Sequence, residues 1–143
     1  MNDGPPARIR INHDDYHASH IGTTCDGRQF FLTQAFVPGV CEYLAVYVFD
    51  ANGALLEARI DDLGPREQVD EAAARALFAA RLADLGDVTL GPIEVAPFQL
   101  ERFGTVFGLV AHPPEEEDED WCVTLEPGDF MCFYPPWDGD YDT

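Results

Sequence analysis

Short segments that are apolar or that alternate between apolar and polar residues are separated by turn residues in the first 64 residues, which predicts short β-strands joined by tight turns. Two of the breaks between these segments contain Asp26-Gly27 and Asn52-Gly53. Such pairs supply the positive φ angles of a hairpin turn at little steric cost. The predicted strands cover residues 8–12, 21–24, 29–37, 42–49 and 54–60.

The two arms of the second hairpin differ in pattern. Residues 42–49 are nearly all apolar, which is typical of a central strand covered on both faces. Residues 54–60 alternate, so this arm is expected to be half-exposed. Its two faces carry Leu56, Ala58 and Ile60 on one side and Glu57, Arg59 and Asp61 on the other.

One segment changes to the helical period. Asp70 is a suitable N-cap and Gly86 is suited to follow a helix C-terminus, which predicts a helix over residues 71–85. Arg81 falls within the apolar stripe, so we expect its charge to extend outward to solvent. The stripe itself must lie on a sheet and consists of Ala74, Leu77, Phe78, Leu82 and Leu85.

After the helix the pattern returns to strands, predicted over 93–101, 105–110, 121–126 and 130–134. Pro97 indicates an edge position or a bulge. The fold class is therefore α+β, with a mainly antiparallel, curled sheet of hairpins packed on a single amphipathic helix at about residues 70–86. We expect one domain over residues 1–143, frayed at 1–7 and with an acidic loop at 113–120.

The chain has 27 acidic residues against 8 basic ones, a formal net charge of −19 over 143 residues. A hydrophobic fraction of 46% nevertheless favours a folded core. The start of the chain lacks the features of a signal peptide, and no apolar run has the length of a membrane span. We therefore expect a cytoplasmic protein with reduced cysteines at Cys25, Cys41, Cys122 and Cys132.

The negative charge is concentrated near the C-terminus, in a block of six consecutive acids and in a tail that alternates Asp with other residues. Such a surface repels nucleic acid and membranes and attracts basic protein partners. Tryptophan and tyrosine anchor many protein interfaces. The predicted partner-binding residues are Glu115, Glu116, Glu117, Asp118, Glu119, Asp120, Trp121, Trp137, Asp138, Asp140 and Tyr141.

Two alternatives to this interpretation stay open. Trp137 and Tyr141 could dock the tail on the domain while its aspartates stay solvated, and the acidity could serve only solubility or salt adaptation. Without the block, 21 acids would still face 8 bases, a charge of −13. The apolar residues 130–134 could likewise form a central strand or a partner surface.

A second hypothesis is a metal-binding module or a metal-dependent enzyme that uses the segment from His13 to His20. His13, His17 and His20 share a face if this segment is helical, whereas His13, Asp15 and His17 share one if it is extended, and imidazole nitrogens are common zinc ligands. The alternative is an ordinary polar connector. Calcium binding of the EF-hand type is excluded for Asp138, Asp140 and Asp142, because the sixth loop position is Thr143 and not Gly.

The sequence contains no nucleophile-elbow or phosphate-loop motif, so no catalytic residue and no cofactor is predicted. Cys41 and Cys122 could meet a histidine across the fold. However, both lie in or beside apolar strands, where thiols are usually buried and inert.

Several motifs resemble a group of small bacterial proteins. They are Ile21-Gly22, Asp26 to Leu32, the Phe49-Asp50-Ala51-Asn52-Gly53 turn and the tail Pro136-Trp137-Asp138-Gly139-Asp140-Tyr141-Asp142-Thr143. The resemblance extends from about residue 8 to the end, and the tail is its most specific part. Some members of this group are labelled formate hydrogenlyase regulatory protein. The resemblance therefore implies a regulatory role without enzymatic activity.

Overall fold

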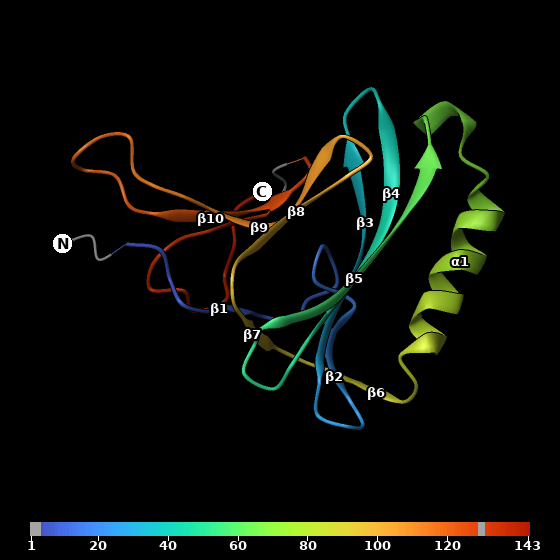
Figure 1. The fold of residues 1–143 in the computed structure, drawn as a ribbon, viewed down its shortest axis with the longest axis horizontal. Coiled ribbons are helices and arrows are strands. Elements are labelled where there is room, and N and C mark those ends of the chain that lie inside the picture. Colours follow the sequence, from blue (N-terminus) through green and yellow to red (C-terminus); the bar gives the residue numbers. More distant parts are fainter. Residues whose placement is uncertain (1–3, 129–130) are drawn as a thin grey trace.

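A computed structural model describes residues 4–128 and 131–143 and confirms the predicted α+β class (Figure 1). Residues 1–3, which belong to the segment predicted to be frayed, and residues 129 and 130, of which Phe130 begins the last predicted strand, lie outside the described residues. A 3₁₀ turn, η1 (Arg66–Gln68), precedes the helix α1 (Glu71–Asp84). The strands are β1 (Ile9–Ile11), β2 (Ile21–Thr24), β3 (Gln29–Val37), β4 (Cys41–Phe49), β5 (Leu55–Gly64), β6 (Val88–Leu90), β7 (Ile93–Val95), β8 (Phe98–Arg102), β9 (Thr105–His112), β10 (Cys122–Glu126) and β11 (Cys132–Phe133).

Five antiparallel strands form the larger sheet in the order β5-β4-β3-β2-β6. The central position predicted for residues 42–49 is confirmed, because β4 lies between β3 and β5 and is buried from Tyr43 to Phe49. β5 is half-exposed with an alternating pattern, as predicted, and lies at the edge of the sheet, but the assignment of Leu56 was wrong. A bulge opposite Val48 and Phe49 leaves Leu56 58% exposed, while Leu55 packs against the core.

The helix covers one face of this sheet (Figure 1). Asp70 caps it by accepting a hydrogen bond from the Ala73 N–H, and Gly86 follows it at φ 78°, as the sequence predicts. Arg81 does not extend to solvent. Its guanidinium binds Asp61 on β5 at 2.9 and 3.1 Å, because the neighbouring strand brings a carboxylate to the helix flank. Four residues of the predicted stripe, namely Leu77, Phe78, Leu82 and Leu85, pack on a second set of apolar residues from β3 and β4, and Ala74 is buried as well. This second set consists of Phe30, Leu32, Leu44, Val46 and Val48.

The opposite face of the larger sheet packs against a second, four-stranded sheet in the order β11-β10-β9-β8. The main core lies between the two sheets, where Tyr47 and Phe49 contact Phe98 edge to face. The prediction of one strand over 93–101 was wrong, because Pro97 separates β7 from β8. β7 pairs with β1 in a separate ribbon, whereas β8 takes the edge position expected beside the proline.

The loop between β9 and β10 carries the acidic block and projects from the second sheet, on the opposite side of the molecule from α1 (Figure 1). All six of its acidic residues are exposed. Within the described chain, α1 and η1 are both too short and too polar to cross a membrane.

Candidate functional site

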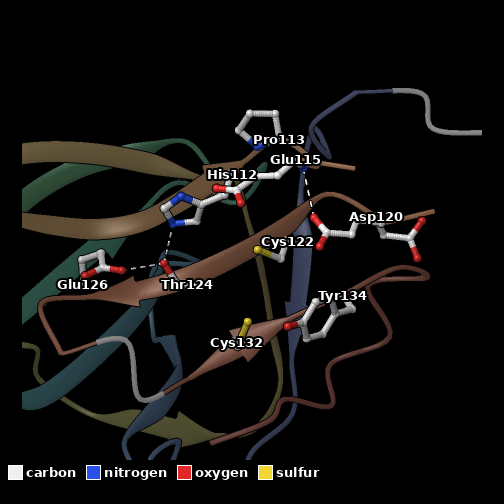
Figure 2. A pocket seen from close by; sticks show the side chains of 10 residues that line it. His112, Pro113, Glu115, Asp120, Cys122, Thr124, Glu126, Cys132 and Tyr134 are labelled. Carbon is white, nitrogen blue, oxygen red and sulfur yellow. Dashed lines mark hydrogen bonds between the residues drawn. The ribbon is translucent and has the colours of Figure 1, made fainter. Parts of the chain in front are cut away.

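A hollow lies on the outer face of the second sheet, beneath the acidic loop (Figure 2). Strand β10 forms the floor of the hollow. Val123 and Leu125 point into the core, so the alternating residues Cys122, Thr124 and Glu126 point toward the hollow. The hollow has a volume of about 600 Å³. Its remaining walls come from β9, the acidic loop and the segment that includes β11: His112, Pro113, Glu115, Glu119, Asp120, Cys132 and Tyr134.

A hydrogen-bonded chain crosses this floor. The buried Thr124 hydroxyl donates to Glu126 Oε2 at 2.7 Å and lies 2.7 Å from His112 Nε2. Because the hydroxyl proton is committed to the carboxylate, His112 Nε2 must be the donor to Thr124. This places the ring hydrogen of His112 on Nε2 and leaves Nδ1 as the acceptor nitrogen.

Two thiols face the same hollow from neighbouring strands (Figure 2). Cys122 pairs across the ladder with His112, and Cys132 pairs with Thr124. The hydrogen bond between Tyr134 and Cys132, together with their charge interaction and partial burial, raises the pKa of Tyr134 to about 12. Cys122 therefore does lie beside a histidine. By contrast, Cys41 contacts Asp62 Oδ1 at 3.0 Å, and burial, reinforced by this carboxylate, raises the pKa of its thiol.

Carboxylates form the rim of the hollow. Glu115, Glu119 and Asp120 descend from the acidic loop, and Glu126 lies on the floor. The Glu115 N–H donates to Glu119 Oε2 at 3.0 Å, so the loop folds back on itself. In the described parts of the chain, the ion pairs between side chains involve Asp26, Asp61 and Asp84 and none of the block. No arginine is among the described residues that line the hollow, so its negative charge is uncompensated there.

The aromatic residues predicted as anchors occupy different settings. Trp121, next to the block, is half-buried, while Trp137 and Tyr141 pack against the main core. Only Asp138 and Asp140 of the tail's predicted contact residues are exposed. Trp137 and Tyr141 thus dock the tail, which is the alternative that the sequence left open.

The docked tail bridges two sheets. On one side its backbone carbonyls accept hydrogen bonds from β1, from Arg10 N–H to Trp137 O at 3.3 Å and from Asn12 N–H to Gly139 O at 3.2 Å. On the other side Asp142 pairs with Cys132 of β11 through two backbone hydrogen bonds of 2.9 Å. The tail therefore acts as an irregular extra strand that closes the end of the domain.

The side chains of Tyr141 and Asp14 hold this tail on the histidine-containing segment. The Tyr141 hydroxyl donates to Asp14 Oδ2, and the backbone N–H groups of Tyr16 and Ala18 donate to Asp14 Oδ1. Burial opposes ionisation of Asp14, but these three hydrogen bonds together lower its pKa. Burial, and then the bond to Asp14, raise the pKa of Tyr141 to about 12.

The three predicted metal ligands are engaged elsewhere. His13 Nε2 lies 3.1 Å from Ser19 O, His20 Nδ1 lies 2.9 Å from Ser19 Oγ, and the His17 ring lies beside Tyr16 and Tyr141. Within residues 4–128 and 131–143, no three His, Cys, Asp or Glu side chains converge on a position that could hold a metal ion. The segment thus connects strands and supports the tail.

Sequence reasoning identified the acidic loop but missed the hollow beneath it. The alternation of Cys122, Thr124 and Glu126 with Val123 and Leu125 is visible in the sequence and marks an outward face. The position of His112 beside this face depends on the β9–β10 register, which the intervening loop conceals. Comparison with known proteins adds no relative, since no family model, curated protein or solved structure matches the chain.

Proposed function

We propose that this chain is a small acidic protein-binding protein, regulatory or immunity-like in type, that engages a basic protein partner in the cytoplasm. The observation that carries the proposal is the uncompensated carboxylate rim above a hollow of about 600 Å³. A lysine or arginine side chain could enter this hollow, while the projecting block would accelerate encounter by long-range attraction. The same charge disfavours nucleic acid and anionic membranes.

The docked tail changes which residues we assign to the contact. The contact is assigned to the exposed block Glu115 to Asp120, three of whose carboxylates line the hollow, together with the half-buried Trp121 that follows it. Asp138 and Asp140 contribute charge, while Trp137 and Tyr141 hold the tail in place. The exposed Tyr134 ring, at 45% exposure, offers the aromatic surface that the sequence assigned to the tail.

The test compares two variants of equal net charge. In the first, the six block residues become Gln or Asn, which changes the formal charge from −19 to −13. In the control, the same exchange is made at six other exposed acids: Asp15, Glu57, Glu67, Asp87, Glu94 and Glu101. Affinity capture from the native lysate identifies basic proteins retained by the wild type, and the association rate of each purified partner is then measured against ionic strength.

We expect the block variant to associate at least about tenfold more slowly, while the control stays close to the wild type. The chain contains no lysine, so carbodiimide coupling of its carboxylates to partner lysines would map the contact without side-chain links between its own copies. Equal retention by both variants, or cross-links remote from the block, would refute this function.

A further inference from the structure

The hollow contains a pair of thiols that the proposed function does not use. Cys122 and Cys132 lie on adjacent antiparallel strands and both line the hollow. We propose that these two sulfurs together bind one soft metal ion that accepts linear two-coordination, with Cu(I) as its representative. The proposal does not depend on the acidic loop having a protein partner.

The ladder register determines how far apart the two residues are. Thr124 is directly opposite Cys132, so Cys122, two residues earlier on β10, is the diagonal neighbour of Cys132. Diagonal neighbours have Cα atoms about 7–8 Å apart. A disulfide usually needs Cα atoms about 4.4–6.8 Å apart, with sulfurs about 2 Å apart. All four cysteines are indeed reduced in the structure.

A metal bridge fits this spacing better than a disulfide does. Two metal–sulfur bonds of about 2.3 Å in line separate the sulfurs by about 4.6 Å. Side chains that lean toward each other from diagonal positions can span that separation without moving the strands. Figure 2 shows both sulfur atoms on the same face of the sheet, with Thr124 beside them.

The surroundings also select the kind of ion. Structural zinc sites use four ligands in a tetrahedron, and the described residues offer no convergent group of three. His112 Nε2 and Glu126 are hydrogen-bonded to Thr124, whereas Cys122 and Cys132 present two soft ligands of the same type from adjacent strands. Thiolates favour Cu(I), whereas the carboxylates of the rim are hard ligands that attract cations without competing for a soft one.

When one Cu(I) binds, the two thiols become thiolates of one bis-thiolate complex and release two protons. Two Cu–S bonds form and two S–H bonds break, and no oxidant or reductant is consumed. Because binding releases two protons, affinity should rise with pH.

The experiment titrates reduced, untagged full-length protein with Cu(I) under anaerobic conditions against a chromogenic Cu(I) chelator. We expect one equivalent to be bound, and either Cys122→Ser or Cys132→Ser to weaken binding about 100-fold or more, beyond the loss typical for an outer-shell partner. Cys25→Ser and Cys41→Ser serve as matched controls and should bind as the wild type does. Zn²⁺ in excess should not displace the ion.

A second measurement needs no substitution, which covers the case in which a variant fails to fold. Alkylation of wild-type thiols, followed by peptide mapping, should show Cys122 and Cys132 protected by one equivalent of Cu(I) while Cys25 stays reactive. Protection of other cysteines instead, or unchanged affinity in both hollow variants, would overturn the proposal. Effective competition by Zn²⁺ would also overturn it, because it would require ligands beyond the pair.

Discussion

Tyr141→Phe is the most direct test of the role assigned to the C-terminal tail. The substitution keeps the aromatic ring against the core and removes only the hydroxyl that donates to Asp14. Asp14 keeps its bonds from the backbone N–H groups of Tyr16 and Ala18, at 2.9 and 3.0 Å. The change therefore isolates one hydrogen bond between the tail and a segment more than a hundred residues earlier in the chain.

Two energies set limits on the stability that Tyr141→Phe should remove. Hydrogen bonds to charged groups contribute about 1.5–3 kcal/mol. The rise of the Tyr141 pKa from 10 to about 12 corresponds to at most about 2.7 kcal/mol. Because the pair is part-buried, solvent screening places the expected loss near the lower bound, at about 1.5 kcal/mol. With a urea dependence of roughly 2 kcal/mol per M for a domain of this size, the unfolding midpoint should fall by about 0.8 M.

The stability difference between wild type and Tyr141→Phe should depend on pH in both acid and alkali. The pKa of Asp14 is lowered on folding, so its contribution is complete above about pH 4 and is lost as the pH falls through the folded value. The pKa of Tyr141 is raised on folding, so its contribution is complete below pH 10 and is lost as the pH rises toward about 12. The difference between wild type and variant should thus be constant between these limits and shrink on both sides.

Urea unfolding followed by far-UV circular dichroism, from acidic to alkaline pH, measures this difference. Tyr16→Phe is the matched control, because it removes a tyrosine hydroxyl from a side chain that is 67% exposed and should change stability by less than about 0.5 kcal/mol. If Tyr141→Phe is no more destabilising than this control at neutral pH, the tail is not held by the bond to Asp14. A difference that grew in acid would contradict the assigned sign.

Two further substitutions test the framework. Gly108→Ala should lower the free energy of unfolding in urea by at least about 2 kcal/mol, because a Cβ there would lie 2.1 Å from a backbone oxygen of β8. Gly104→Ala is the control, since it has open space around it and should cost only about 1 kcal/mol. Equal losses for the two variants would contradict the close packing of β9 on β8. Arg81→Met should lower the free energy of unfolding by about 1–2 kcal/mol in the same assay, because it leaves the half-buried Asp61 unpaired. Arg75→Met, on the exposed face of the helix, should change it by less than about 0.5 kcal/mol. Similar values for the two variants would indicate that the ion pair contributes little.

The elements that the sequence predicted well are those that depend on local signals. The helix required only an N-cap, an apolar stripe and a following glycine, all within 17 residues. The hairpin of β4 and β5 required one Asn-Gly pair and the contrast between an apolar and an alternating arm. In both cases the determining contacts are close in sequence, so the pattern of residues carries nearly all the necessary information.

The failures have a different physical origin. Leu56 follows the alternating pattern, yet a bulge exposes it, and no residue type at that position marks the bulge. The charge of Arg81 is satisfied by Asp61, which is 20 residues away in sequence and becomes a neighbour only when α1 packs beside β5. Separation of β7 from β8 depends on which strands pair, and the pairing of β7 with β1 is a contact between distant parts of the chain.

The same distinction explains how the candidate site was only half predicted. Six consecutive acids cannot pack, so their exposure follows from the sequence alone. The hollow below them depends on the registers of β9 with β10 and of β10 with β11, which place His112, Cys122 and Cys132 on one face. In the tail, a prediction made from residue type was misleading. Its aromatic residues suggested an interface with a partner, but they pack against the core of the same chain. The tail docks there because its backbone pairs with backbone groups of β1 and β11. The partner surface that we propose is therefore centred on the acidic loop and its hollow.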